Sequence, residues 1–519
     1  MLIWEAPGLA AQRVVVVGAG VAGLVAAIEL AAHGVAVTLV ERAAQPGGKM
    51  REVEVDGARL DAGPTVLTLR TVFDAIFASA GSSLDAHLTL RPLPILARHA
   101  WDEGGTLDLF ADLARAADAI AEFAGPAEGR RYLQFCAHAQ RIFATLDQTF
   151  IRADRPSLLG LIAAFGPRRL GQLVQIQPFE TLWSALGRYF HDPRLRQLFG
   201  RYATYVGSSP FTSPATLMLV AHVEQAGVWL IEGGMHRLAA ALTGLAAGLG
   251  VEVRYGADAA EIAVAGDRVA GVRLRDGALL SAEAVIFNGD HAALGAGLLG
   301  AGVSRAAPRT LPRARSLSAV TWLLQAETEG FALDHHNVFF SRAYRSEFDD
   351  ILLHGRLPET PTVYLCAQDR GLGDRPAGPE RLFCLVNAPA TGDQRPPSAG
   401  EIEQCAERAF ALMERCGLSI RRRPEQTRVV TPADFAALFP GTGGALYGRA
   451  SHGWKAAFDR PGVRTRIPGL YLAGGSVHPG PGVPMAALSG RMAASALLAD
   501  RASIVRSRPA AMSGGTSTR

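Results

Sequence analysis

A glycine-rich segment near the N-terminus constrains the fold of this chain more than any other feature. Val14–Val17 is a run of β-branched residues and predicts a strand buried in a parallel sheet. The segment Gly18-Ala19-Gly20-Val21-Ala22-Gly23 follows it and opens an apolar helix that we expect to end near Ala32. A second buried strand, Val35–Val40, leads directly to Glu41. This order of strand, glycine loop, helix and strand predicts a βαβ unit.

The spacing of the glycines predicts a dinucleotide site within this unit. Gly18 allows a tight turn, Gly20 lets the backbone approach a pyrophosphate, and Gly23 lets the helix pack closely on the strand. The helix N-terminus presents free N–H groups and the positive end of a dipole to the phosphates. Glu41 is placed to accept hydrogen bonds from a ribose diol. These residues fit NAD and FAD equally well, so the loop alone leaves the choice of dinucleotide open.

The whole chain is predicted to be a mixed α/β protein with more than one domain, because 519 residues exceed what one hydrophobic core normally holds. Helix-length segments follow the first part, and strand-like segments dominate later. Asp276-Gly277 predicts a hairpin turn between two of the later strands. The predicted parts are a cofactor-binding βαβ part at 1–110, a helical insertion at 111–227, a return to the cofactor-binding domain at 228–300, a sheet-containing substrate domain at 301–440, a C-terminal cofactor-binding part at 441–503 and a disordered tail at 504–519.

Composition limits the kinds of partner that this chain can have. There are 52 Lys and Arg residues against 48 Asp and Glu residues, and the resulting net charge of +4 is too small to indicate nucleic-acid binding. Hydrophobic residues make up 49% and charged residues only 19%, which fits an apolar ligand or a membrane surface, and also an Ala- and Gly-rich coding bias. No stretch reaches the roughly 18 uninterrupted apolar residues that a spanning helix needs, and no signal peptide is visible.

The cysteines predict neither a disulfide framework nor a metal centre. They lack CxxC spacing and are odd in number: Cys136, Cys366, Cys384, Cys405 and Cys416. We therefore expect reduced, buried thiols of an intracellular protein, and no metal ligands.

Further motifs bear on the choice between NAD and FAD. Gln45–Arg51 (QPGGKMR) resembles the glycine-doublet motif that follows the ribose-binding acid in many FAD-dependent oxidases and desaturases. This resemblance implies that the doublet continues a flavin cradle, and that Asp61–Thr65, a rigid turn, passes along the isoalloxazine ring. At the far end of the chain, the strand and glycine pair of Leu470–Gly475 precede Gly480–Met485, which opens a helix. The N-terminus of that helix would stabilise negative charge on the reduced ring.

Longer strings resemble the bacterial carotenoid desaturases, the family related to phytoene desaturase. Within that family the chain is most similar to the hydroxyneurosporene desaturases, also called methoxyneurosporene dehydrogenases or 1-hydroxycarotenoid 3,4-desaturases. The resemblance covers roughly residues 13 to 495. It rests on the strings Asp61–Arg70 (DAGPTVLTLR), Ile231–Met235 (IEGGM), Val285–Asp290 (VIFNGD), Phe339–Asp350 (FFSRAYRSEFDD), Thr362–Arg370 (TVYLCAQDR), Ala445–Trp454 (ALYGRASHGW) and Gly474–Leu488 (GGSVHPGPGVPMAAL).

This resemblance implies FAD as the cofactor and a Rossmann-like FAD-binding domain of the amine-oxidase and desaturase type. The resemblance also implies that Lys49 and Arg51 balance the negative charge of the pyrophosphate. Many related flavoproteins carry an acid after the C-terminal strand to bind the ribityl chain, whereas Gly475-Ser476 stands there in this sequence. The implied cofactor-binding residues are Gly18, Ala19, Gly20, Val21, Ala22, Gly23, Glu41, Arg42, Gly48, Lys49, Met50, Arg51, Pro64, Thr65, Ala259, Gly474, Gly475, Val483, Pro484 and Met485.

The implied activity is the introduction of a C=C bond at the 3,4 position of a 1-hydroxy or 1-methoxy acyclic carotenoid. A phytoene desaturase acting on unhydroxylated carotenes is the alternative within the family. An FAD amine oxidase and a non-catalytic isoprenoid-binding protein are alternatives that share the fold. The electron acceptor, oxygen or a quinone, is not identified by the sequence.

No catalytic base is assigned from the sequence. Tyr447, His452 and His478 lie in motifs near the expected flavin end, and each also fits a structural role. Because carotenoids partition into bilayers, we expect a cytoplasmic protein held peripherally on the inner, photosynthetic membrane. The helical insertion is the candidate membrane surface, with Arg168, Arg169, Arg194 and Arg196 beside apolar segments. A solvated face beside a core helix remains open as the other interpretation of these arginines.

Overall fold

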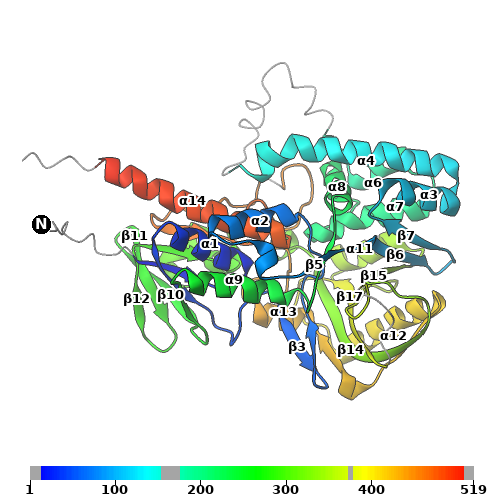
Figure 1. The fold of residues 1–519 in the computed structure, drawn as a ribbon. Coiled ribbons are helices and arrows are strands. Elements are labelled where there is room, and N and C mark those ends of the chain that lie inside the picture. The colour runs from blue at the N-terminus through cyan, green and yellow to red at the C-terminus, as the bar shows by residue number, and fades with distance from the viewer. Residues whose placement is uncertain (1–12, 154–175, 372–377, 457, 508–519) are drawn as a thin grey trace, which may run out of the picture.

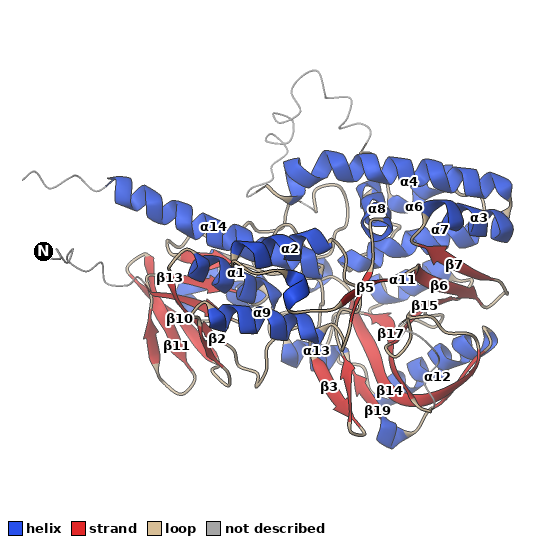
Figure 2. Cartoon of the chain, in the orientation of Figure 1, coloured by secondary structure: helices blue, strands red, loops and turns tan. Residues whose placement is uncertain are grey.

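The computed structural model of the chain describes residues 13–153, 176–371, 378–456 and 458–507. Figure 1 shows two sheet-bearing parts side by side, with a group of helices lying over the second of them. Figure 2 distinguishes the helices from the strands in both parts and shows α12 beside the long strand β14 of the second.

The first part is built on a parallel sheet in the order β20-β13-β1-β2-β9. Val17 at the end of β1 pairs with Val40 of β2 on one side and with Phe287 of β13 on the other, so β1 is central. A central parallel strand is buried on both faces, which explains the uninterrupted valines. The strands are β1 (Arg13–Val17), β2 (Ala36–Val40), β9 (Glu252–Arg254), β13 (Ala284–Phe287) and β20 (Leu470–Leu472).

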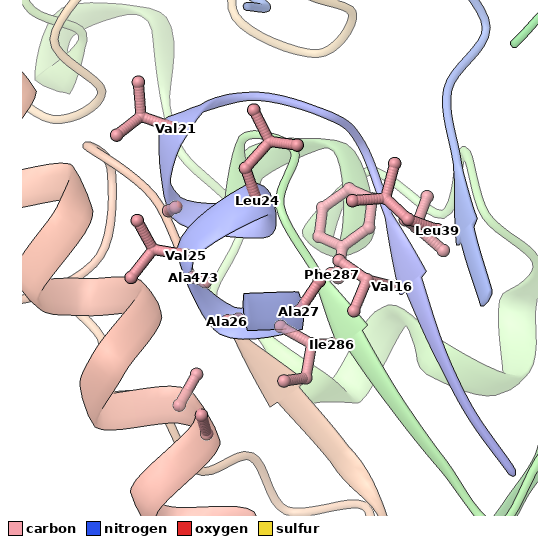
Figure 3. Packing of buried hydrophobic residues seen from close by; sticks show 14 of the residues in the cluster. Val16, Val21, Leu24, Val25, Ala26, Ala27, Leu39, Ile286, Phe287 and Ala473 are labelled. Carbon is pink, nitrogen blue, oxygen red and sulfur yellow. The ribbon is translucent and has the colours of Figure 1, made fainter. Parts of the chain in front are cut away.

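Helices α1 (Val21–Ala32), α9 (His236–Gly248) and α14 (Val483–Ser507) pack together against this sheet. In Figure 3, Leu24 and Ala27 of α1 meet Val16, Leu39 and Ile286 from the strands. Gly490 of α14 lies so close to α1 that a Cβ atom there would stand 2.2 Å from the carbonyl oxygen of Ala22. The N- and C-terminal motifs therefore meet within one core.

Smaller elements surround this core. Hairpins and short sheets are formed by β3 (Glu52–Val55) with β4 (Ala58–Asp61), by β5 (Leu90–Pro92) with β8 (Trp229–Ile231), and by β10 (Ala259–Ala265), β11 (Arg268–Leu274) and β12 (Leu279–Ser281). The helices here are α2 (Arg70–Ser79), η1 (Leu84–Ala86), α10 (His291–Gly295), η5 (Ala301–Ala306) and η6 (Pro312–Ala314).

The second part is a large, mostly antiparallel sheet in the order β18-β14-β17-β16-β15-β6-β7, with β19 also paired to β14. Its exception is the parallel pair of β6 with β15. The strands are β6 (Ile95–Trp101), β7 (Thr106–Phe110), β14 (Ser318–Gly330), β15 (His336–Phe340), β16 (Val363–Ala367), β17 (Glu380–Ala388), β18 (Leu418–Arg421) and β19 (Thr427–Val430). The accompanying helices are α11 (Tyr344–Leu352), α12 (Ala399–Arg415), η7 (Pro424–Gln426) and α13 (Pro432–Leu438).

The helical part has its own core of stacked aromatic side chains. Phe135 packs on Phe190 and Phe199 with ring centroids 5.2 and 4.8 Å away, and Tyr132 stacks on Phe199. Its elements are α3 (Leu113–Ala124), α4 (Pro126–Leu146), the π-helical turn η2 (Asp147–Ile151), α6 (Leu182–Tyr189), α7 (Pro193–Gly200), η3 (Arg201–Val206), η4 (Ala215–Met218) and α8 (Leu219–Gln225).

Three details differ from the sequence-based expectation. The Asp276-Gly277 turn joins β11 to the short β12, while β13 leaves the hairpin for the parallel sheet. Strands β6 and β7, within the segment 1–110, pair with the large antiparallel sheet rather than the parallel one. Helix α14 continues to Ser507, past residue 504, where the tail was expected to begin.

Candidate cofactor and substrate site

One cavity of about 1540 Å³ runs from the glycine loop to the helical part and the second sheet. Its wall contains every residue that the sequence assigned to the cofactor except Ala19 and Gly23. Residues from both ends of the chain therefore face one space, although the strands that carry them are hundreds of positions apart.

The glycine loop is shaped as the spacing predicts. Gly18 has a φ of +102°, in the region that favours glycine. A Cβ atom on Gly20 would stand 2.8 Å from the side-chain nitrogen of Asn288, and one on Gly23 would stand 2.0 Å from the carbonyl oxygen of Gly18. Gly23 therefore serves the packing of α1 on β1, which explains why it does not line the cavity.

Glu41 lies where β2 ends and connects the two sides of the loop. Its carboxylate accepts hydrogen bonds from the backbone N–H of Ala19 at 2.7 Å and from that of Ala43 at 2.8 Å. The side chain is buried and also lines the cavity, so lone pairs remain for a ligand. Ala19 does not line the cavity, and its backbone N–H instead helps to hold the Glu41 carboxylate in place.

The glycine doublet extends the same cradle. Gly47 donates its N–H to the carbonyl oxygen of Ala19 at 2.9 Å and forms a parallel bridge with Gly20. Gly48 has a φ of +59°, and a Cβ atom there would approach the Cα of Gly20 to 3.2 Å. The doublet and the first loop therefore form one continuous surface of backbone without side chains.

Two basic side chains follow the doublet. The Lys49 ammonium group donates to the carbonyl oxygen of Leu446 at 2.5 Å, and burial lowers its pKa, with Arg460 acting in the same direction and Asp290 against it. Burial also lowers the pKa of Arg51, whose buried Nη2 has no hydrogen-bond partner among the described residues. Arg51 therefore has a donor available toward the cavity that it lines.

The Asp61–Thr65 turn enters the cavity wall beside these residues. The Asp61 carboxylate accepts hydrogen bonds from the backbone N–H groups of Met235 and His236, at the N-terminus of α9. Burial raises the pKa of Asp61, while those two hydrogen bonds oppose the rise. Pro64 and Thr65 line the cavity, and the Thr65 hydroxyl lies 2.6 Å from the hydroxyl of Tyr364.

The C-terminal segment closes the opposite wall. Gly474 and Gly475 follow β20, and Val483, Pro484 and Met485 form the first turn of α14, all of them at the cavity. The helix N-terminus thus points its free N–H groups toward this space, with Pro484 at a position that needs no donor.

Three residues that the sequence did not assign complete this end of the cavity. Asn288 donates from Nδ2 to the carbonyl oxygen of Gly18 at 3.2 Å. Arg460 holds the carbonyl oxygens of Tyr447 and Gly475, and burial lowers its pKa to about 10. Asp290 lines the cavity with its Oδ2 buried and unpartnered among the described residues. The string Val285–Asp290 was part of the family resemblance, and its position at the end of a parallel strand was the available signal.

The three polar residues considered for catalysis differ in position. Tyr447 lines the cavity, and burial raises its pKa. The imidazoles of His452 and His478 are not part of that wall, and burial lowers the pKa of His478 to about 4. His478 packs edge-on against Phe150, at 5.2 Å between ring centroids. Both histidines therefore fit the structural interpretation better than the catalytic one.

The far part of the cavity is mainly apolar. It is lined by side chains of α4, η2, η4 and α8 together with two residues of strand β17: Phe143, Leu146, Phe150, Ile151, Leu217, Leu219, Val220, Val223, Phe383 and Leu385. Polar groups interrupt this surface at Arg201, Tyr205, Glu224 and Tyr364, and again at Tyr344, Glu347, Thr362 and Asn387. The cavity therefore joins a glycine cradle to a long, mainly apolar compartment that contains several polar groups.

Two of the four arginines proposed for a membrane surface lie in the described helical part. Arg194 forms an ion pair with Asp192 and lies over the ring of Phe123, and Arg196 lies over Trp183 and donates to its carbonyl oxygen. Arg168 and Arg169 lie outside the described residues. No helix in the described ranges is long and apolar enough to cross a membrane.

Comparisons with known proteins agree with this geometry. Residues 21–498 match the model of the family described as flavin containing amine oxidoreductase. The chain is 56% identical over 98% of both chains to hydroxyneurosporene desaturase of Rubrivivax gelatinosus. It is 49% identical to the enzyme of that name from Cereibacter sphaeroides, over 95% of this chain and 98% of the other. It is 32% identical to a lycopene-forming phytoene desaturase of Pseudescherichia vulneris, over 94% of this chain and 99% of the other.

Solved structures resemble the chain in fold. An oxidoreductase from Methanosarcina mazei superimposes with a TM-score of 0.59 at 17% identity, over 94% of this chain and all of the other. Putrescine oxidase superimposes with a TM-score of 0.57 at 15% identity, over 94% of this chain and 99% of the other. At such identities the likeness concerns the fold alone.

Proposed function

The chain belongs to the flavin-containing amine oxidoreductases and, among them, to the carotenoid desaturases, and on this basis we propose that it introduces a C=C bond at the 3,4 position of a 1-hydroxy or 1-methoxy acyclic carotenoid. Its cofactor is FAD. The observation that carries the proposal is the near-complete alignment with the hydroxyneurosporene desaturases, and the cavity that joins a nucleotide cradle to an apolar compartment supports it.

The cradle fits FAD at several points. We infer that Gly18, Gly20 and the first turn of α1 hold the pyrophosphate, because both glycines line the cavity at the helix N-terminus and present backbone without side chains there. The Glu41 carboxylate would accept from the ribose, and Arg51 has a free donor for the phosphates. Lys49, bound to the Leu446 carbonyl oxygen, is less free for the phosphates than the sequence implied.

The remaining assigned residues are proposed for the flavin end. Pro64 and Thr65 would lie along the isoalloxazine ring, and the first turn of α14 would face its pyrimidine edge. With Gly475-Ser476 in place of an acid, the ribityl chain would contact backbone groups that Arg460 holds in position. Arg42, Met50 and Ala259 line the cavity near the adenosine part and are proposed as packing contacts.

Desaturation removes a hydride and a proton from neighbouring carbons, and bound FAD supplies the hydride acceptor. The apolar wall of α4 and α8 holds the polyene and excludes water.

The proton requires a base or a water molecule. Asp290 has an unpartnered oxygen at the cavity, beside Lys49 and Arg460, and Glu347 is a second buried carboxyl group there, with its pKa raised by burial. Substitution of these two carboxyl groups is the direct way to identify the base.

The carotenoid enters from a bilayer in this proposal, so the protein is placed peripherally on the cytoplasmic side of the inner, photosynthetic membrane. Phe179 is 78% exposed, packs edge-on against Trp454 at 5.4 Å, and lines the cavity together with it. An exposed aromatic pair at a cavity wall is suited to contact with lipid. In a vesicle flotation assay, Phe179→Ser should bind lipid more weakly than the wild type. Equal lipid binding would show that this aromatic pair is not the membrane-binding surface.

The function is tested with purified protein and candidate carotenoids in lipid vesicles, with chromatography of the products. Hydroxyneurosporene should give a product that is two hydrogens lighter, whereas phytoene should not be converted. Conversion of phytoene without conversion of hydroxyneurosporene would favour the phytoene desaturase alternative. Oxidation of amines, or a flavin-free protein unable to take up FAD, would favour the other two alternatives.

The reduced cofactor must pass its electrons to an acceptor, for which we propose oxygen or a quinone. Comparison of turnover under air with anaerobic turnover in the presence of a soluble quinone separates the two. Turnover that stops without oxygen and is not restored by quinone identifies oxygen.

A further inference from the structure

We propose that Arg201 recognises the oxygen atom on carbon 1 of the substrate, with Tyr205 and Glu224 holding its guanidinium group in place. This inference rests on the proposed function, because it requires a substrate that carries an oxygen atom at carbon 1. It goes beyond that function by assigning substrate selection to one side chain in the helical part.

Arg201 opens η3 and lines the cavity within a mainly apolar wall. Its guanidinium carbon lies 5.3 Å from the ring centroid of Tyr205 and 5.2 Å from that of Tyr364. Nη1 donates to the Tyr205 hydroxyl at 3.3 Å, and no carboxylate of the described residues comes within ion-pair distance. A guanidinium group has five N–H donors, so most of them lack a partner among the described residues, and the side chain lines the cavity.

The buried carboxyl group of Glu224 belongs to the same cluster and accepts from the Tyr202 hydroxyl at 2.7 Å. Burial and the neighbouring Glu224 raise the pKa of the Tyr205 hydroxyl. The Tyr205 oxygen accepts from Arg201, so its own proton remains for Glu224. The cluster therefore offers the cavity donors from Arg201 and no competing donor from Tyr205.

A group that only donates suits this substrate class. The oxygen of a hydroxyl or of a methoxy group can accept a hydrogen bond, whereas only the hydroxyl can donate one. A guanidinium group therefore binds both forms, while a carboxylate would bind the hydroxyl alone. A carotenoid without the oxygen would leave the donors desolvated and unpaired, which is the arrangement that gives strong discrimination.

The position of Arg201 also fits the reaction. Carbon 1 is only a few bonds from carbons 3 and 4, so a group that binds its oxygen must lie close to the flavin-facing wall. Thr65 belongs to the turn expected along the flavin, and its hydroxyl lies 2.6 Å from that of Tyr364. The ring of Tyr364 in turn contacts the guanidinium group, so one side chain separates Arg201 from that turn.

The test compares Arg201→Met with the wild type as purified FAD-loaded enzymes in vesicles, on hydroxyneurosporene, its 1-methoxy form and neurosporene. We expect kcat/KM to fall on the order of 100-fold for the two oxygenated substrates and to stay unchanged or rise for neurosporene. The oxygenated substrates should also bind more weakly, as measured by polyene quenching of protein fluorescence with the electron acceptor withheld. Arg196→Met is the matched control, because Arg196 also lies over an aromatic ring, 4.2 Å from Trp183, and is not part of the cavity wall.

An equal loss on all three substrates, or an unchanged preference, would overturn the role of Arg201 while the desaturase function stands. A wild type that converts neurosporene as well as hydroxyneurosporene would also overturn it. If the wild type converts none of the three, the proposed function itself fails. If Arg201→Met does not retain flavin, Arg201→Lys and Tyr205→Phe serve instead, and each should reduce the preference for the oxygenated substrates without a change in flavin content.

Discussion

The carboxylate of Asp61 accepts a 2.6 Å hydrogen bond from the backbone N–H of Met235, 174 positions later in the chain. A second hydrogen bond, from His236, completes the cap of helix α9. Gly234 is needed at this contact, because a Cβ atom there would stand 2.5 Å from the carboxylate. The motifs Asp61–Arg70 and Ile231–Met235, both part of the family resemblance, therefore contact each other directly. This contact anchors the turn that carries Pro64 and Thr65.

Asp61→Ala should therefore destabilise the protein and loosen the cofactor at the same time. Loss of a buried cap leaves two N–H groups unpaired, at a cost of about 1–3 kcal/mol in the free energy of unfolding. Thermal unfolding and flavin content measure the two effects. Ser398→Ala removes the exposed capping box of α12 and should lower stability by about 1 kcal/mol without loss of flavin. Equal flavin loss in both variants would contradict a local role for Asp61.

Much of the cofactor end could be predicted because its signals are local. The φ of Gly18, the close packing of Gly23 and the position of Glu41 after a strand all follow from a short stretch of sequence. The C-terminal loop was placed at the same site by resemblance, and it lines the same cavity. The sheet order and the assignment of β6 and β7 to the second sheet depend on contacts between distant segments, which local patterns do not encode.

The substrate end could not be predicted for a different reason. Arg201, Tyr205, Glu224 and Tyr364 come from η3, α8 and β16 and meet only in the folded chain. In the sequence, Arg201 resembles the other arginines of the helical part, such as Arg194 and Arg196, which pair with neighbouring side chains instead. Burial and the direction of hydrogen bonds distinguish them, and neither can be read from residue spacing.

Gly23→Ala should abolish flavin retention. The added methyl group would stand 2.0 Å from the carbonyl oxygen of Gly18, so α1 must move away from β1 and distort the loop. The purified variant should be colourless or should bind added FAD more than about 100-fold more weakly, corresponding to about 3 kcal/mol. Gly244→Ala in α9, where nothing lies within 4 Å of the new methyl group, should keep its flavin and gain up to about 1 kcal/mol in stability. Full flavin content in Gly23→Ala would show that the loop tolerates the displacement.

Glu41→Gln should weaken FAD binding through the loop as well as through the ribose. The carboxylate uses one oxygen for Ala19 and the other for Ala43, and an amide can accept at only one of these. The unpaired N–H should cost about 1–3 kcal/mol, so titration of the apoprotein with FAD should show roughly 10- to 100-fold weaker binding. Glu252→Gln, an exposed acid on the neighbouring β9, should bind FAD normally. Normal FAD binding by Glu41→Gln would show that the Glu41 carboxylate does not contribute to the FAD site.

The pH dependence of stability should depend in part on His99. This imidazole is 4% exposed, stacks on Phe340 and lies 3.2 Å from the Leu107 carbonyl oxygen. Burial lowers its pKa from 6.5 to about 3, and the positive charge of Arg201 acts in the same direction. Between these two values the unfolded chain binds a proton that the folded chain does not. Stability contributed by the neutral imidazole is therefore complete above about pH 6.5 and is lost as the pH falls toward 3.

His99→Phe keeps the aromatic stack and removes the titration. Urea unfolding of the wild type and the variant from pH 7.5 down to pH 4 should show a shallower loss of stability in the variant, by up to about 1.4 kcal/mol per pH unit below pH 6. Above pH 7 the difference between the two proteins should be constant, because the imidazole is neutral in both states there. A constant difference across the whole range would mean that His99 keeps an ordinary pKa in the folded protein, and that the neighbouring positive charge of Arg201 is compensated at the cavity wall.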